Sequence, residues 1–179
     1  MNPTYIILHH SSVSQKKNKK QFRAINNYHK SLWDFKSSLG YYVGYQYLIE
    51  PSGKVIQARR NTETGAHCYQ QDMNHKSIGI CLTGHFDLEQ PKPKQIFALR
   101  DLLRKLCKDY VIPVKNIKTH NEFAKKSCPG SNIDIVFIRS LVTEVKPEPE
   151  PINKDKLINE LFELHQKESD LIDKLKGIS

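Results

Sequence analysis

The tract KPEPEP, residues 146–151, is the feature that most limits how this chain can fold. Each proline lacks an N–H donor and fixes its own φ angle, so alternating prolines exclude a helix or a central strand and favour an extended spacer. We therefore divide the 179-residue chain into three parts. Residues 1–144 are predicted to form a globular domain, residues 145–152 a Pro/Glu-rich linker, and residues 153–179 an amphipathic helix.

The segment before the spacer alternates strand patterns with helix patterns. The apolar runs Tyr5–Leu8 and Ser77–Thr83 predict buried strands. Tyr45–Glu50 and Lys54–Ala58 predict a hairpin, because Pro, Ser and Gly between them supply turn chemistry. The apolar residues at helical spacing are Phe22, Ile25, Tyr28 and Leu32, and, after Pro93, Ile96, Leu99, Leu103, Leu106 and Tyr110. Interleaved strands and helices indicate an α/β fold, with a mixed central β-sheet flanked by helices.

Beyond the spacer, apolar residues recur in the 4-3 phase of a heptad repeat. They are Leu157, Leu161, Leu164, Leu171, Leu175 and Ile178. Three interpretations stay open for this helix: a coiled coil that makes the protein a homo-oligomer, a helix that folds back on the domain, and a docking helix for another protein.

The net charge of +9 is unevenly distributed. From Pro147 onward the chain contains five Lys and eight Asp and Glu residues, so the preceding residues carry 23 basic and 11 acidic side chains. A body this basic attracts polyanions, including nucleic acid, anionic lipid and the anionic polymers around peptidoglycan. The cluster Lys16, Lys17, Lys19 and Lys20 is either a solvated loop or part of this attraction. Nucleic acid is not the expected ligand, because no interleaved aromatic residues and no nucleic-acid-binding motif accompany the charge.

The apolar run near the N-terminus is too short for a membrane span and is interrupted by the polar pair His9 and His10. We interpret it as a strand and not as a signal peptide, and we expect no stable membrane insertion. The four cysteines lack the spacing of a disulfide scaffold or a CxxC motif. Synthesis in a reducing cytoplasm is the simplest expectation.

Three residues have the side-chain chemistry of a catalytic zinc site, which needs three protein ligands and one open position. His9 ends an apolar strand, and His120 and Cys128 bracket the loop HNEFAKKSC. Neither the spacing nor the residue types are diagnostic by themselves, since a histidine at a strand end is commonly a hydrogen-bonded structural group.

Four segments in a fixed order carry a resemblance to a known family. They are IILHHSS, VGYQYLI with SGKV after it, NHKSIGICLTG, and THNEFAKKSCPG. Together they resemble the zinc-dependent N-acetylmuramoyl-L-alanine amidases, a family that includes amidase-type phage lysozymes and animal peptidoglycan recognition proteins. The resemblance covers about residues 4 to 142.

The resemblance implies a role for individual residues. His9, His120 and Cys128 match the family's zinc ligands, so Zn²⁺ is the expected cofactor. Tyr45 and Lys126 match the catalytic tyrosine and lysine. The implied activity is hydrolysis of the amide between N-acetylmuramic acid and L-alanine in peptidoglycan, with the cysteine ligand favouring an enzyme over a recognition module. The first hypothesis is a phage or prophage endolysin, released to act on the cell wall as a bacteriolytic enzyme, or a bacterial autolysin-like enzyme.

Several further residues are candidates for the site. His10 alternates away from His9 along the strand, so we expect a structural or supporting role. The resemblance places His67 in the cleft, where we expect contact with substrate, against the alternative of a satisfied loop histidine. The aromatic residues Trp33, Tyr41 and Tyr42 are expected either to line a sugar-binding groove or to pack in the core. The other cysteines, Cys68, Cys81 and Cys107, are expected to be free thiols, and His29, His75, His85 and His165 ordinary packing or surface residues.

A second functional hypothesis belongs to another class of protein. An amidase-fold binding or regulatory protein could contact peptidoglycan or a polymerase through its basic surface and C-terminal helix. The complete set of predicted zinc ligands, with Tyr45 and Lys126, favours the enzyme.

Overall fold

The computed structural model of this chain describes residues 1–16, 21–143, 164 and 166–168. The chain divides into two units, Met1–Glu144 and Val145–Ser179. Among the described residues, no helix combines the length and the apolar character needed to cross a bilayer. Of the second unit, only residues 164 and 166–168 are described, and they are helical.

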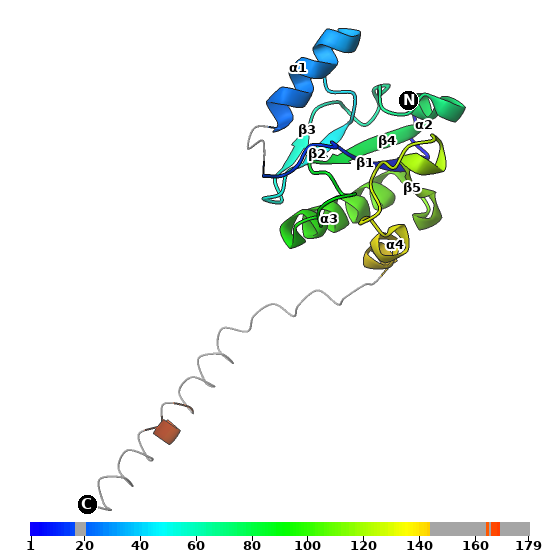
Figure 1. Cartoon of the computed structure of the whole chain (residues 1–179). Coiled ribbons are helices and arrows are strands. Elements are labelled where there is room, and N and C mark those ends of the chain that lie inside the picture. The colour runs from blue at the N-terminus through cyan, green and yellow to red at the C-terminus, as the bar shows by residue number, and fades with distance from the viewer. Residues whose placement is uncertain (17–20, 144–163, 165, 169–179) are drawn as a thin grey trace, which may run out of the picture. The chain divides into compact units, whose positions relative to one another are not determined.

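A five-stranded mixed sheet forms the centre of the first unit (Figure 1). Its strands are β1 (Tyr5–His10), β2 (Tyr47–Ile49), β3 (Val55–Gln57), β4 (Ser77–Leu82) and β5 (Ile117–Thr119). They lie in the order β3-β2-β4-β1-β5. All neighbours are parallel except β2 and β3, which form the antiparallel hairpin at one edge. The central strands β1 and β4 are almost wholly buried, which explains their continuous apolar sequences.

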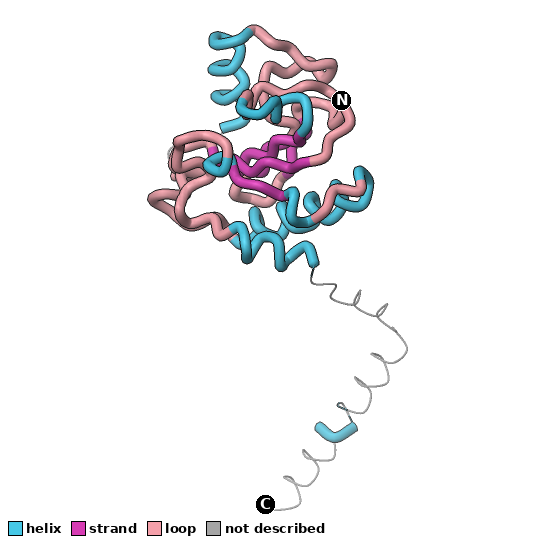
Figure 2. The backbone as a smooth tube through the Cα atoms, turned by 90° about the vertical axis from the view of Figure 1, so that its right-hand side faces the viewer, coloured by secondary structure: helices cyan, strands magenta, loops and turns pink. Residues whose placement is uncertain are grey.

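Helices cover both faces of the sheet (Figures 1 and 2). The α-helices are α1 (Gln21–Trp33), α2 (Met73–Lys76), α3 (Pro93–Tyr110) and α4 (Ile135–Thr143). Three 3₁₀ helices are η1 (Gln70–Asp72), η2 (Val114–Asn116) and η3 (His120–Glu122). Helix α1 lies on one face, and α3 and α4 lie on the other.

The main core lies between the sheet and α3. Leu99, Leu103 and Leu106 of α3 are fully buried in one cluster with apolar residues of the strands. Pro93 opens this helix at a position where its missing N–H has no helical partner in any case. Leu103 sits in the middle of this buried face, so truncating it would remove apolar contacts on all sides.

Helix α1 packs less completely than its sequence pattern predicts. Phe22 and Ile25 pack beside a smaller cluster that contains Leu48 and Cys81. Tyr28 and Leu32, on the next turns, are 61% and 49% exposed. Only the first half of the predicted apolar face is therefore used to hold α1 against the sheet.

The predicted fold class, a mixed sheet flanked by helices, is confirmed. The hairpin and the strand at Ser77–Leu82 also form as predicted. Strand β5 and helix α4 were not predicted. Several predicted features lie outside the described residues, so they stay predictions. They are the linker, the apolar heptad positions after it other than Leu164, and Lys17, Lys19 and Lys20.

Candidate active site

Parallel pairing of β1 with β5 brings two of the predicted zinc ligands together. Leu8 pairs with Thr119 in the β1–β5 register, so the next residues in sequence, His9 and His120, lie side by side. Their ring centroids are 4.5 Å apart. The two histidines are 111 positions apart in sequence, and the sheet register alone makes them neighbours.

Cys128 is held beside these histidines by contacts on both sides of its loop. The His10 N–H donates to Cys128 Sγ over 3.4 Å, and the Asn121 N–H donates to the Cys128 carbonyl over 2.8 Å. The Asp87 carboxylate accepts from Ser127 Oγ and from the Ser131 N–H, on either side of the cysteine. The cysteine is therefore fixed by groups that themselves lie outside the ligand set.

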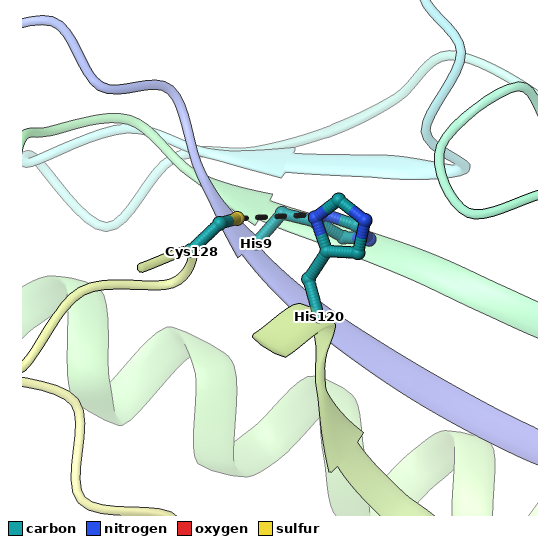
Figure 3. Close-up of side chains that lie close together, drawn as sticks. All are labelled: His9, His120 and Cys128. Atoms are coloured by element: carbon teal, nitrogen blue, oxygen red, sulfur yellow. Dashed lines mark hydrogen bonds between the residues drawn. The ribbon is translucent and has the colours of Figure 1, made fainter. Parts of the chain in front are cut away.

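His9, His120 and Cys128 present donor atoms that all lie within 4.8 Å of one another (Figure 3). Cys128 Sγ lies 3.6 Å from His9 Nδ1. A tetrahedral zinc ion with Zn–N of about 2.1 Å and Zn–S of about 2.3 Å would separate its N and S ligands by about 3.6 Å. The donor types, their number and this separation fit a zinc ion bound by three protein ligands.

Burial sets the protonation states of the three donors. Burial, helped by His67, His120 and Lys126, holds the pKa of His9 well below 6.5. Burial, helped by Lys126 and His10, lowers the pKa of His120 to about 4. Neutral imidazole is the form that binds metal. Burial raises the pKa of the Cys128 thiol to about 11, although the His10 N–H and Lys126 oppose the rise. Metal binding at neutral pH must therefore displace the thiol proton.

A cavity of about 430 Å³ opens beside these donors. Its lining residues are Trp33, Tyr45, Ala66, His67, Cys68, Tyr69, Gln70, Asn74, His120 and Lys126. Both predicted catalytic residues, Tyr45 and Lys126, thus share one cavity with a predicted metal ligand. Lys126 is exposed, so its ammonium can reach a bound substrate without a desolvation cost in the free protein.

Tyr45 packs against His9, one of the predicted metal ligands. Its ring centroid lies 5.0 Å from that of His9. Burial, together with the nearby Cys81 and Cys128 thiols, raises the pKa of Tyr45 well above 10. The phenol therefore keeps its proton at neutral pH.

His67 lines the cavity, and one of its ring nitrogens faces His9. The distance between His67 Nδ1 and His9 Nε2 is 3.1 Å. Burial lowers the pKa of His67 to about 3, so the ring is neutral. No local sequence pattern predicts this contact.

His10 points away from the three donors, toward a second group formed with His85 and Asp87. Its Nδ1 accepts from the Phe86 N–H, and its Nε2 lies 2.7 Å from Ser12 Oγ. A neutral ring whose Nδ1 accepts carries its proton on Nε2, so no lone pair is left for a metal. These contacts fit the structural role expected for His10.

The other aromatic candidates separate into two groups. Trp33 lines the cavity. Neither Tyr41 nor Tyr42 lines the cavity. Tyr41 packs edge-on against Phe22, and the Tyr42 ring lies under the ammonium groups of Lys30 and Lys36. Sequence reasoning missed Asp87 and Asn74, the latter of which accepts from the N–H groups of His67 and Cys68.

His29 gives a prediction for acid stability. It lies between Trp33 and Tyr45, its Nδ1 accepts from the Gly44 N–H, and burial, with Arg59, lowers its pKa from 6.5 to about 4. A depressed pKa stabilises the fold above pH 6.5, and this contribution is lost as pH falls from 6.5 to about 4. It is at most about 3 kcal/mol.

The His29→Gln variant keeps an acceptor for Gly44 but does not titrate. Its free energy of unfolding, measured with urea between pH 7 and 4, should fall less steeply than that of the wild type. Parallel pH profiles of the two proteins would refute the assignment.

Comparisons with known proteins identify the family to which this chain belongs. The family model for N-acetylmuramoyl-L-alanine amidase matches residues 1–131. The chain therefore belongs to the N-acetylmuramoyl-L-alanine amidase family. The matched segment of the chain includes His9, Tyr45, His67, His120, Lys126 and Cys128.

Two kinds of relative are similar in sequence. The endolysin of Escherichia phage T7 is 35% identical over 97 residues, which are 51% of this chain and 61% of the endolysin. Peptidoglycan-recognition protein SC1a of Drosophila melanogaster is 29% identical over 141 residues, which are 73% of this chain and 69% of that protein. The chain thus matches less than two thirds of the length of the phage endolysin.

Solved structures show the same fold. The N-acetylmuramoyl-L-alanine amidase LysC from Clostridium intestinale URNW superposes with a TM-score of 0.68 at 26% identity, over 80% of this chain and 87% of LysC. Drosophila peptidoglycan recognition protein SD superposes with a TM-score of 0.62 at 21% identity. One fold thus accommodates both amidases and recognition proteins.

Proposed function

We propose that this protein is a zinc-dependent N-acetylmuramoyl-L-alanine amidase that hydrolyses the amide between N-acetylmuramic acid and L-alanine in peptidoglycan. One observation carries the proposal. His9, His120 and Cys128 converge at zinc-ligand distances beside a cavity that also contains Tyr45 and Lys126. A protein that only binds peptidoglycan does not need three metal donors next to an exposed lysine and a protonated phenol.

The proposed roles follow from where each side chain lies. His9, His120 and Cys128 would hold the ion. When bound, zinc would act as a Lewis acid and lower the pKa of a water molecule. Lys126, on the cavity lining, would place a positive charge beside the oxyanion that develops on the scissile carbonyl. Tyr45 keeps its proton, so it would donate a hydrogen bond to the reacting oxygen rather than act as a base.

The Tyr45→Phe variant isolates that hydrogen bond, because it removes one oxygen and keeps the ring against His9. We expect kcat to fall by about 10²-fold with zinc affinity unchanged. Turnover on purified sacculi and zinc content are the measurements. Tyr41→Phe, outside the cavity, is the matched control. Full activity in Tyr45→Phe would remove Tyr45 from the mechanism.

A second candidate function is peptidoglycan recognition without hydrolysis. The similarity to the Drosophila peptidoglycan-recognition protein supports this second candidate. Both functions share the cavity, so binding to sacculi does not separate them, whereas turnover does. Contact with a polymerase and self-association through the C-terminal helix stay predictions from the sequence.

A phage or prophage endolysin is the proposed biological setting, supported by the similarity to the T7 endolysin. The protein would be made in the cytoplasm and would act on the wall after release.

The experiment that tests the proposed function is metal-dependent solubilisation of purified sacculi. We expect the protein to clear a sacculus suspension, a chelator to stop it, and stoichiometric Zn²⁺ to restore it. Clearing that continues at the full rate in metal-free protein would refute zinc dependence, and binding without clearing would leave the recognition function.

A further inference from the structure

We propose that His67 is a positioning residue for His9: it accepts a hydrogen bond from His9 Nε2 and thereby leaves His9 Nδ1 free to bind the metal. This inference rests on the zinc centre proposed above. It replaces the expectation from sequence that His67 serves to contact substrate.

The two ring nitrogens of His9 face different partners. His9 Nδ1 lies 3.6 Å from Cys128 Sγ, on the side of the metal donors, and His9 Nε2 lies 3.1 Å from His67 Nδ1. A neutral imidazole has one N–H and one lone pair. His9 can therefore bind metal through Nδ1 only if its proton is on Nε2. That proton points at His67 Nδ1, which must then supply the lone pair.

The proton of His67 is thereby assigned to its other nitrogen. His67 Nε2 is buried and has no partner at normal hydrogen-bond geometry among the described residues. Both neutral rings then carry their proton on Nε2: His9 Nδ1 is left for the metal, and His67 Nδ1 accepts from His9.

The surrounding backbone fixes the ring of His67 in place. A Cβ atom added at Gly79 would lie 2.6 Å from His67 Cδ2, and one added at Gly65 would lie 2.5 Å from the same atom. Only glycine at both positions leaves room for the ring. Asn74 Oδ1 accepts from the His67 N–H over 2.9 Å and so holds its backbone. A ring so confined suits a positioning role better than adaptable contact with a substrate.

Metal-ligating histidines generally donate their second N–H to a fixed acceptor, and loss of that acceptor typically costs about 10- to 100-fold in metal affinity. The acceptor is usually a carboxylate, a carbonyl or water, and here it is a second histidine. We therefore expect an effect of this size when the acceptor is removed.

The test is the zinc dissociation constant of the full chain, measured by competition with a chelator of known affinity. His67→Phe keeps a ring but removes the acceptor, and its zinc affinity should fall about 10- to 100-fold. His67→Gln, whose amide oxygen can accept from His9, should recover most of that loss. His75→Phe, at an exposed histidine paired with Asp72, is the control and should bind zinc as the wild type does.

Two further measurements cover the case in which His67→Phe does not fold. Gly79→Ala places a Cβ atom against the His67 ring and so displaces the ring while keeping the histidine. This variant should also bind zinc more weakly. Nitrogen-15 NMR of the zinc-loaded wild type should find both His9 and His67 protonated on Nε2.

Different outcomes would overturn different claims. Wild-type zinc affinity in His67→Phe, with only KM raised, would assign His67 to substrate contact and overturn the inference. A His67 protonated on Nδ1 would overturn it as well. Failure of the wild type itself to bind zinc would instead refute the proposed zinc centre, and the inference would fall with it.

Discussion

The Cys128→Ser variant is expected to lose hydrolysis of peptidoglycan and to bind zinc at least about 100-fold more weakly than the wild type. Serine is nearly isosteric with cysteine, but its hydroxyl does not ionise at neutral pH and is a poor zinc ligand. The loop itself should persist, because Asp87 and Asn121 hold it through groups other than the thiol. Zinc content after dialysis and turnover on sacculi are the two measurements.

The matched control is Cys107→Ser. Cys107 is also a free cysteine, but it lies on α3 within the main core cluster, on the other side of the sheet from α1. We expect this variant to keep wild-type zinc content and activity. A Cys128→Ser protein that hydrolyses sacculi at the wild-type rate would contradict the metal assignment.

The Lys126→Ala variant is expected to lose about 10²- to 10³-fold in kcat, the usual cost of removing one group that stabilises an oxyanion. Lys126 lies on the cavity lining, and its charge reaches His9 and His120, since it lowers the pKa of both. It is not one of the three donors, so zinc affinity should change only slightly. Turnover on sacculi, with zinc content measured in parallel, separates the two effects.

Lys125→Ala is the control for charge. Lys125 is also exposed and stands next to Lys126 in sequence, but it does not line the cavity. A loss of general attraction to the anionic wall would lower the activity of both variants equally, and such equality would contradict a catalytic role for Lys126.

The parts of the fold that the sequence predicts are those with a strong local pattern. The buried strands β1 and β4 have continuous apolar sequences, and α3 repeats its leucines at helical spacing after Pro93. Strand β5 has only three residues, Ile117–Thr119, with a lysine at the centre. Its strand conformation depends on pairing with β1, which no local pattern records.

The candidate site divides in the same way. The donor residue types could be named from the sequence, but their convergence depends on the β1–β5 register and on the loop contacts of Asp87. The resemblance to a family supplied that missing information for His9, His120 and Cys128. The resemblance placed His67 in the cleft but could not give the orientation of its ring. That orientation depends on contacts with Gly65, Gly79 and Asn74 in the folded chain.

The choice of His9 over His10 illustrates what strand geometry adds. Successive residues of β1 point to opposite faces, and the structure places His9 with the metal donors while both ring nitrogens of His10 have partners elsewhere.

The products of digestion test most directly whether this chain cuts the amide between N-acetylmuramic acid and L-alanine. Purified sacculi treated with the zinc-loaded protein should yield stem peptides with a free L-alanine amino terminus and glycan strands whose lactyl carboxylates are unsubstituted, both identified by mass spectrometry. Metal-free protein should yield neither. Products cut within the glycan or within the peptide, or intact sacculi after treatment with zinc-loaded protein, would contradict the account.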